Sequence, residues 1–347
     1  MKTLEMLNKD LSIPIATGWR VANLAEYRGK QELFMRQSPQ KLKALCEHAL
    51  IESAVSSNRI EGVEVDPARI KVLMGGAPAY RDRNEEEVAG YRLALNWIHS
   101  EGSTIPFSED TVLRLHKLCR GEIWDAGRYK DKPVDVIELS PRGERTIRFI
   151  TVSPQETPGA VRELMTGFDD GLKSVLIHPL ILLAALNLDF LCIHPFRDGN
   201  GRVSRLLLLL SCYRVGFKVG RYISLERIIE ENKERYYETL KISSEGWHQG
   251  KHNPWHYINY LLFILKEAYR ELEARVGEMD APRGAKMELV LEALKKMKGP
   301  FSLSELEAAC PGVSREWIKS ILGGLKKKNR LVCNGRGRGA RWTYLGE

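Results

Sequence analysis

Apolar residues recur three and four positions apart along most of this 347-residue chain, which predicts amphipathic helices. Residues 1–37 are mixed and predict no clear element. Asn84 precedes three glutamates and is expected to cap its helix, because a side-chain acceptor and acidic residues both stabilise a helix N-terminus. Helices are expected to begin at or near Pro39, Pro67, Asn84, Ser108, Glu156, Pro179, Ser224, Asn232 and Asn253.

Two short segments alternate between apolar and polar residues instead. Residues 134–139 and 146–150 flank the sequence Ser140-Pro141-Arg142-Gly143, which is typical of a tight turn. We therefore expect a β-hairpin in an otherwise helical chain. Most isolated hairpins are simple surface features, but an exposed strand edge can also pair with an extended peptide.

The most apolar part of the chain lies near its middle, at residues 175–193. It contains His178, Asn187 and Asp189, and a polar loop follows it directly. Those polar residues favour a helix buried in the protein core over one that spans a membrane.

The C-terminal part of the chain has a different organisation. A short linker at 279–284 precedes three helical segments and then two apolar segments separated by a turn rich in glycine and arginine. Three helices followed by two strands are typical of a winged helix-turn-helix domain. The third helix would then be the recognition helix, and Arg336, Arg338 and Arg341 would lie on or near the wing.

The net charge of +8 is concentrated in this C-terminal part. Residues 283–347 hold 14 Lys and Arg against 6 Asp and Glu, whereas the preceding residues hold 39 of each sign. A basic winged helix favours DNA binding, but such domains also serve as docking or dimerisation modules for proteins. A DNA partner, a protein partner and a homodimer all remain open.

The overall composition is that of a soluble globular protein, with 43% hydrophobic and 28% charged residues. Residues 1–5 lack the apolar core of a secretory signal. The six cysteines form no CxxC pair, so neither a zinc site nor a disulfide framework is indicated. We therefore expect a cytoplasmic protein without membrane association.

Residues 194–205 form a polar loop between two highly apolar segments, and they read His-Pro-Phe-Arg-Asp-Gly-Asn-Gly-Arg-Val-Ser-Arg. The two glycines can adopt positive φ and leave backbone amides open. The helix that follows presents free N–H groups and its positive dipole end, which favour an anion. The last two arginines are three residues apart and share one helix face. Together these groups indicate a phosphate site with a base and a metal ligand.

The same twelve residues match the pattern His-x-Phe-x-Asp/Glu-Gly-Asn-Gly-Arg-x-x-Arg, so the chain resembles the Fic family. The resemblance implies transfer of AMP from ATP to a Ser, Thr or Tyr hydroxyl of a target protein. It also implies a mainly α fold, a Fic-type helical bundle with a β-hairpin flap, to which the tail adds a small C-terminal winged helix domain. The expected domains are an N-terminal helical region (1–110), a catalytic domain (111–280) and the winged helix-turn-helix domain (281–347).

The resemblance also assigns roles within the loop. His194 would take the proton from the attacking hydroxyl, and Asp198 would hold Mg²⁺. The amides of residues 199–201 would face the α-phosphate, with Arg202 on the β-phosphate and Arg205 on the γ-phosphate. Phe196 would anchor the loop, and Arg197 stands at a variable position. The ATP-binding set comprises Phe196, Arg197, Asp198, Gly199, Asn200, Gly201, Arg202, Arg205, Tyr236 and Tyr237.

Tyr236 and Tyr237 resemble the aromatic wall beside the adenine in this family. Because adjacent helical residues point about 100° apart, we expect at most one of them to stack on the base. Ser244 stands where some relatives have Asn, which leaves the details of base recognition open. The predicted hairpin is similar to the Fic flap, which aligns a target segment by strand pairing, and its docking edge would be Val136, Ile137, Glu138 and Leu139.

A second motif lies upstream of the loop. Residues 57–62 fit the pattern Ser/Thr-x-x-x-Glu-Gly/Asn of the inhibitory helix found in autoinhibited Fic proteins, here expected at about 45–62. Ser57 and Glu61 are one helical turn apart and share a face, and Gly62 is a natural helix stop. The resemblance implies that Glu61 pairs with Arg205 and so withholds that arginine from the γ-phosphate. In some relatives this glutamate also helps to remove AMP.

Two other functions compete with this interpretation. The chain can be a transcriptional regulator whose Fic-like domain senses nucleotide while the tail binds DNA, or a Fic enzyme that uses another nucleotide donor. The complete set of catalytic residues favours the enzyme over the regulator. The intact Asp198 and arginine pair favour a nucleoside triphosphate, and the identity of the base is only weakly determined.

Overall fold

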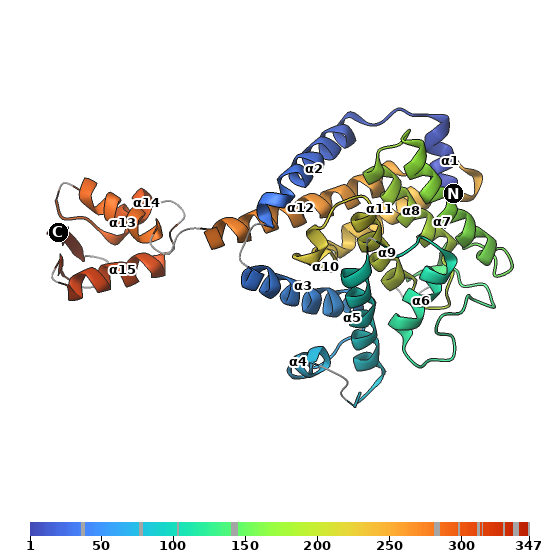
Figure 1. The fold of residues 1–347 in the computed structure, drawn as a ribbon, viewed down its shortest axis with the longest axis horizontal. Helices are drawn as coiled ribbons and strands as arrows, with labels where there is room; N and C mark the ends of the chain where they lie inside the picture. Colours follow the sequence, from blue (N-terminus) through green and yellow to red (C-terminus); the bar gives the residue numbers. More distant parts are fainter. Residues whose placement is uncertain are drawn as a thin grey trace. The chain divides into compact units, whose positions relative to one another are not determined.

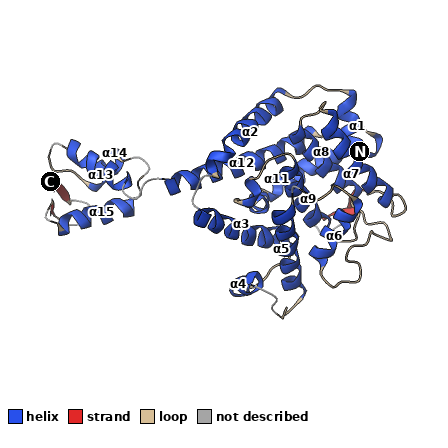
Figure 2. Ribbon diagram, in the orientation of Figure 1, coloured by secondary structure: helices blue, strands red, loops and turns tan. Residues whose placement is uncertain are grey.

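The structure is a computed structural model of the chain and describes all residues except 36–38, 76–78, 103, 140–144, 281–284, 298, 311–312, 314, 329, 336–339 and 346–347. The described residues divide into two compact units, Met1–Glu273 and Ala274–Glu347. The chain is mainly helical, as predicted (Figures 1 and 2).

The larger unit holds most of the helices and one of the two β-hairpins. Each helix expected from Pro39 onward is present, with ends that differ from the prediction by a few residues. The elements are α1 (Lys2–Lys9), α2 (Ile15–Phe34), α3 (Pro39–Ile60), α4 (Pro67–Gly75), α5 (Arg83–Glu101), α6 (Glu109–Arg120), β1 (Val136–Leu139), β2 (Arg145–Phe149), α7 (Thr157–Ser174), α8 (Pro179–Ile193), α9 (Asn200–Arg214), η1 (Val219–Arg221), α10 (Leu225–Glu231), α11 (Lys233–Ser244), η2 (Trp247–Gln249) and α12 (Trp255–Asp280). The last residues of α12, from Ala274 onward, belong to the smaller unit.

Helix α8 is the centre of this unit (Figure 1). Every residue from Leu180 to Ile193 is buried, and α1, α7, α9 and α11 pack around the helix. A helix that is apolar on all sides is stable in water only when other elements cover it completely. The predicted buried core helix is therefore confirmed. Among the described residues, no helix is both long and apolar enough to cross a membrane.

Helices α1 and α2 lie in the segment for which the sequence predicted no element. The buried residues of α2 include Thr17, Leu24 and Gln31, which are seven positions apart. Two of these three are polar and dock through hydrogen bonds: Thr17 donates to Asn259 at 3.0 Å, and Gln31 accepts from Tyr269 at 2.7 Å. The buried face of α2 is narrow and partly polar, so its apolar residues do not recur with helical spacing in the sequence. The sequence therefore does not predict this helix.

The start of α5 also differs from the prediction. The N-cap is Asp82, whose carboxylate accepts from the backbone N–H of Glu85 at 3.0 Å. Asn84 lies inside the helix and donates instead to the carbonyl of Glu64 at 3.1 Å. The prediction that Asn84 caps this helix is therefore wrong, and a carboxylate two residues earlier takes the role.

Strands β1 and β2 form the predicted hairpin. They pair antiparallel with Ile137 opposite Ile147 and Glu138 opposite Thr146, and the register shifts between Val136 and Ile137. The turn predicted at 140–143 lies outside the described residues.

The smaller unit contains the predicted three helices and two strands: α13 (Ala285–Lys296), α14 (Leu303–Ala309), α15 (Arg315–Lys327), β3 (Leu331–Asn334) and β4 (Arg341–Tyr344). A separate apolar cluster holds it together, with Leu294, Leu306 and Leu322 at its centre. Of the three arginines expected near the wing, Arg341 begins β4 and is half exposed, while Arg336 and Arg338 lie outside the described residues.

Two polar side chains within α8 tie it to its neighbours. Asn187 donates to the carbonyl of Ser204 on α9 at 2.7 Å and accepts from Tyr257 on α12 at 2.6 Å. Asp189 is fully buried and accepts from the backbone N–H of Thr3 at 3.0 Å, from the Thr3 hydroxyl and from Trp247 Nε1 at 2.7 Å. These contacts join α1 and η2 to the central helix.

Replacing Asp189 with asparagine tests this anchor. Burial raises the pKa of the Asp189 carboxyl to about 6, above its ordinary value of 3.8. The folded protein therefore holds this proton more tightly than the unfolded chain does. As the pH rises from about 4 to about 6, Asp189 should lower the free energy of unfolding by roughly 2–3 kcal/mol. In denaturant unfolding, the unfolding free energy of the wild type relative to Asp189→Asn should therefore fall by that amount over this pH range. The comparison removes the opposite contribution of the buried histidines, whose pKa values are lowered to about 4 and which both proteins share.

Asp170→Asn is the matched control, because Asp170 is exposed and pairs only with Lys173 among the described residues. Its stability should follow the wild type across the same pH range. Parallel curves for the wild type and Asp189→Asn would contradict the anchor.

Candidate functional site

His194 ends the central helix in an unusual backbone conformation. Its φ of 52° and ψ of 61° are left-handed, and its N–H still donates to the carbonyl of Phe190 at 2.9 Å. A residue other than glycine in this region costs roughly 1 kcal/mol or more, so surrounding contacts must hold it there.

Lys130 supplies two of those contacts. Its backbone N–H donates to the carbonyl of Pro195 at 3.0 Å, and its Nζ donates to the carbonyl of Ile193 at 3.1 Å. The side chain is buried, and burial lowers the pKa of Lys130 to about 8. The carbonyls on both sides of His194 are thus held by one residue.

Phe196 anchors the loop from the next position. Its ring is fully buried and stacks on His116 from α6 with 3.7 Å between ring centroids. Asn200 closes the turn, because its Oδ1 accepts from the N–H of Phe196 at 2.9 Å and its Nδ2 donates to the same residue's carbonyl at 2.8 Å. Phe196 and Asn200, both predicted ATP-binding residues, therefore have their side chains committed to the shape of the loop.

Gly199 and Asp198 lie where the loop enters α9. Gly199 has a φ of 83° and is the N-cap of this helix. Asp198 is half exposed, accepts from the N–H of Gly199 at 2.6 Å and from Arg120 Nη1 at 2.7 Å. Although burial acts to raise it, the attraction of Arg120 and Arg202 holds the pKa of Asp198 below its ordinary value. Asp198 is thus an available carboxylate at the mouth of the loop.

Arg202 is buried and bound to acceptors from two other helices. Its Nη1 donates to Glu87 Oε2 on α5 at 2.7 Å and to Asn58 Oδ1 on α3 at 3.2 Å. Glu87 also accepts from Arg120 at 2.8 Å, so a buried carboxylate links two arginines. Arg197 is exposed, and its guanidinium lies 5.4 Å from the ring centre of Trp124.

Arg205 is held by the end of α3. Its Nε donates to Ser57 Oγ at 2.8 Å, and its Nη2 donates both to the carbonyl of Ser57 and to Glu61 Oε1, each at 2.8 Å. Helix α3 ends at Ile60, and Gly62, with a φ of 80°, lies in the turn that follows. The pairing of Glu61 with Arg205 that the sequence implied is present in the structure.

Glu61 also lies against the backbone of Gly201. A Cβ placed on Gly201 would come within 2.2 Å of Glu61 Oε1. Only glycine permits this approach, so the carboxylate occupies the space in front of the first turn of α9.

The imidazole of His194 is well shielded. Burial, reinforced by the charge of Lys130, lowers the pKa of His194 to about 4. The ring therefore stays neutral at physiological pH and can accept a proton.

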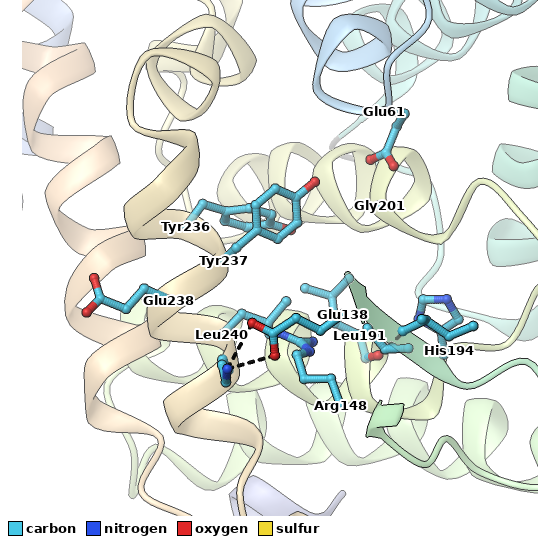
Figure 3. A pocket seen from close by; sticks show the side chains of 13 residues that line it. Glu61, Glu138, Arg148, Leu191, His194, Gly201, Tyr236, Tyr237, Glu238 and Leu240 are labelled. Carbon is cyan, nitrogen blue, oxygen red and sulfur yellow. Dashed lines mark hydrogen bonds and ion pairs between the residues drawn. The ribbon is translucent and has the colours of Figure 1, made fainter. Parts of the chain in front are cut away.

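A cavity of about 620 Å³ opens over these groups (Figure 3). His194, Gly201 and Glu61 line it at one end, and Tyr236 and Tyr237 line it from α11. The hairpin contributes Val136, Ile137, Glu138 and Arg148, and the other lining residues are Leu191, Glu238, Leu240 and Lys241. Segments far apart in the sequence thus meet around one space.

The two tyrosines differ in their surroundings. Tyr236 is buried among Tyr257 and Tyr260, whereas Tyr237 is 40% exposed. Their ring planes are inclined by 60°. Tyr237 is therefore the one with a ring face free for a ligand, and Tyr236 packs behind it.

The remaining predicted residues lie beside the cavity or away from it. Phe196, Arg197, Asp198, Gly199, Asn200, Arg202, Arg205 and Ser57 do not line the cavity itself. Leu139 belongs to β1, and the position of its side chain lies outside the described part of the structure.

Sequence reasoning missed Glu87, Arg120, Lys130 and Arg148, all of which contact or face the site. The sequence marked Glu87 only as one of three acids in the first turn of a helix. Each of those acids has a different partner: Glu85 binds Arg69, Glu86 accepts from the N–H of Glu122, and Glu87 binds the site arginines. Nothing local distinguishes them.

Comparison with known sequences gives a consistent result. Residues 106–212 match the model of the Fic/DOC family. The chain is 26% identical over 219 residues to the protein adenylyltransferase Fic of Nematostella vectensis, covering 59% of this chain and 46% of that protein. It is 25% identical over 221 residues to the protein of the same name from Drosophila willistoni, covering 61% of this chain and 40% of that protein. The chain thus spans less than half the length of these two curated relatives.

Solved structures share the fold. A Fic family protein from Desulfovibrio desulfuricans superposes with a TM-score of 0.62 at 21% identity, covering 97% of this chain and 98% of that one. Fic-1 from C. elegans superposes with a TM-score of 0.57 at 20% identity, covering 76% and 73% of the two chains. The predicted Fic-type helical fold is therefore confirmed. With the loop at 194–205 and the family match around it, residues 106–212 of this chain form a Fic/DOC family domain.

Proposed function

We propose that this protein is an autoinhibited protein adenylyltransferase, which transfers AMP from ATP to a Ser, Thr or Tyr hydroxyl of a target protein. The observation that carries the proposal is the cavity that joins a neutral, partly buried His194 to the first turn of α9, to an aromatic face and to a strand edge. The relatives named protein adenylyltransferase support the reaction type. The volume of about 620 Å³ is that of a small-molecule site.

His194 acts as the general base. As the hydroxyl oxygen of the target forms its bond to the α-phosphorus, the neutral imidazole accepts the hydroxyl proton. The bond between the α-phosphorus and the bridging oxygen breaks, and pyrophosphate leaves. Lys130 acts indirectly, because it holds the carbonyls on both sides of His194 and so fixes the direction of the ring.

The N-terminus of α9 stabilises the phosphates. Its amides at residues 200 and 201 face the developing charge, while the N–H of Gly199 donates to Asp198, and the helix dipole adds to their effect. Arg202 binds the β-phosphate and Arg205 the γ-phosphate. Hydrogen bonds to other residues of the protein hold both guanidinium groups in place before ATP binds, so their positions are preorganised.

Asp198 fits a magnesium site. It is the half-exposed carboxylate beside the phosphate-binding amides, and Mg²⁺ commonly binds one or two carboxylates together with substrate phosphates and water. The described residues contain no cluster of three or more protein ligands, which agrees with an ion carried in by the nucleotide. When bound, Mg²⁺ would neutralise charge on the triphosphate.

Glu61 inhibits the reaction by competing with the nucleotide for the same groups. Its carboxylate pairs with Arg205 and lies against Gly201, both assigned here to the triphosphate. Two anions in this space repel each other, so ATP either binds weakly or binds with its α-phosphate displaced from His194. Ser57 accepts from Nε and Nη2 of the guanidinium and keeps Arg205 in place.

The hairpin forms the docking surface for the target. We assign Val136, Ile137, Glu138 and Leu139 to the edge that pairs with an extended segment of the target protein, whose hydroxyl then lies near His194. Ile137 and Ile147 are exposed on the hairpin, which suits contact with an apolar side chain of that segment.

The smaller unit is proposed to be a winged helix domain. Its order of three helices and two strands, with a separate core, supports this assignment. Its excess of positive charge fits DNA, and an exposed Trp317 on α15 fits a protein partner. Gel-shift assays with genomic DNA fragments separate these two kinds of partner.

Glu61→Gly should raise modification. Removing the carboxylate frees Arg205, and a hydrogen bond between charged groups is worth about 1.5–3 kcal/mol, so we expect the rate to rise by about 10- to 100-fold. Mass spectrometry after incubation with a mixture of nucleotides would detect auto-modification, and the mass increment would identify the donor. Glu64→Gly is the matched control, because Glu64 is exposed and three residues away. Equal rates for the wild type and Glu61→Gly would contradict autoinhibition.

Incubating the AMP-modified protein with and without Glu61 tests whether the same glutamate also supports removal of AMP. Release of AMP that depends on Glu61 would support the reverse activity.

His194→Ala in the Glu61→Gly protein should abolish modification, because no other base lines the described cavity near the loop. The pH profile gives a second test. Since the pKa of His194 is lowered to about 4, the base remains neutral well below pH 6.5. We therefore expect kcat/KM of Glu61→Gly to stay constant from pH 7 down to about pH 5 and to fall at lower pH. Half-loss of activity near pH 6.5 would show that the imidazole is not shielded in this way.

A further inference from the structure

Arg148 on β2 is a cation that faces the cavity without a protein partner. Within the described part of the chain it makes no hydrogen bond and no ion pair, and its Nε is buried with no acceptor. Figure 3 shows the side chain reaching into the space between the hairpin and α11. A buried donor without an acceptor destabilises a protein, so its retention inside a ligand cavity points to an acceptor that a ligand brings.

The neighbouring acids are already engaged elsewhere. Both carboxylate oxygens of Glu138 accept from Lys241 Nζ, at 2.7 and 3.0 Å. Glu61 binds Arg205 on the opposite side of the cavity. Burial lowers the pKa of Arg148, although the guanidinium remains charged. Its donors are therefore available to a molecule that enters the cavity.

Arg148 lies at the part of the cavity where the nucleoside end of such a molecule would bind. Tyr236 and Tyr237 lie on one side of the space, and Arg148 and Leu191 lie on the other (Figure 3). The proposed phosphate groups, by contrast, are around Gly201 and Arg205. A flat ring that rests on Tyr237 therefore presents its edge or its second face to Arg148.

We propose that Arg148 is a specificity-determining residue that donates a hydrogen bond to a ring-nitrogen acceptor of the purine base of the donor nucleotide. This inference rests on the proposed function, because it deepens the recognition of the same nucleoside triphosphate. A guanidinium has only donors, so it selects a base by the acceptors on that base's edge. Loss of this contact weakens binding of the nucleotide and leaves the chemistry of transfer intact.

Binding of ATP with Mg²⁺ measured by calorimetry provides the test. The parent protein is Glu61→Gly/His194→Ala, which frees the phosphate site and does not consume the nucleotide. Adding Arg148→Ala should weaken ATP binding about 10- to 100-fold, the effect of one charged hydrogen bond. In the parent, one of the analogues 1-deaza-, 3-deaza- and 7-deaza-ATP should bind at least about 10-fold more weakly than ATP. That difference should vanish in the Arg148→Ala protein.

Arg145→Ala removes the same charge from the same strand, where the side chain is exposed, and should leave ATP binding unchanged. Arg148→Lys keeps the charge and should still lose the discrimination between ATP and that analogue. Matching thermal unfolding curves for all variants would exclude misfolding.

Unchanged ATP affinity in Arg148→Ala would overturn the proposal, as would a parent that binds all three analogues as tightly as ATP. Unchanged affinity with lower transfer in the active Glu61→Gly background would assign Arg148 to the target segment instead. A parent that binds no ATP would contradict the proposed function itself, which keeps the two failures distinct.

Discussion

The burial of two arginines on α9 constrains the whole of the larger unit. Arg202 and Arg205 are almost inaccessible to solvent, and a buried charge without a partner costs several kcal/mol. The partners come from elsewhere: Glu87 on α5, and Ser57, Asn58 and Glu61 at the end of α3. Helices α3 and α5 must therefore pack on α9 for the loop to exist in this form. The segment proposed to inhibit the enzyme is thus part of the structure that holds the proposed phosphate site together.

The two arginines nevertheless differ in how easily their acids can be displaced. Glu87 is buried and shared between Arg202 and Arg120, so its removal would take the buried counter-charge from two arginines at once. Glu61 keeps 29% of its side-chain surface exposed and has Arg205 as its partner, while Ser57 also accepts from Nε and Nη2 of the guanidinium. A nucleotide phosphate can replace Glu61 without disturbing the core. The difference in exposure separates the structural ion pair from the one proposed to regulate.

The sequence predicted the parts of this architecture that depend on local pattern. The apolar run of α8, the glycine-containing loop and the spacing of Ser57 and Glu61 are each recognisable within a few residues. Helix α2 could not be predicted, because Thr17 and Gln31 occupy its buried seam and their partners lie more than 180 residues away. Glu87 could not be told from Glu85 and Glu86, since only the packing of α5 on α6 and α9 gives each acid its partner. Arg148 could not be identified from the sequence, because what distinguishes it is a buried Nε with no hydrogen-bond acceptor among the described residues, which only the structure reveals.

The geometry of His194 fits the proposal that control acts on the phosphate site. Lys130 binds the carbonyls on both sides of His194, and the buried Phe196 anchors the chain two residues later, so the left-handed backbone of His194 is fixed. The imidazole makes a long contact of 3.4 Å to the carbonyl of Leu191. With a pKa near 4, the imidazole is neutral whether or not Glu61 is engaged. A base that is already positioned and deprotonated cannot itself be the point of regulation at physiological pH. The proposed inhibition would then act on the position of the α-phosphate, through Arg205 and Gly201, which Glu61 contacts.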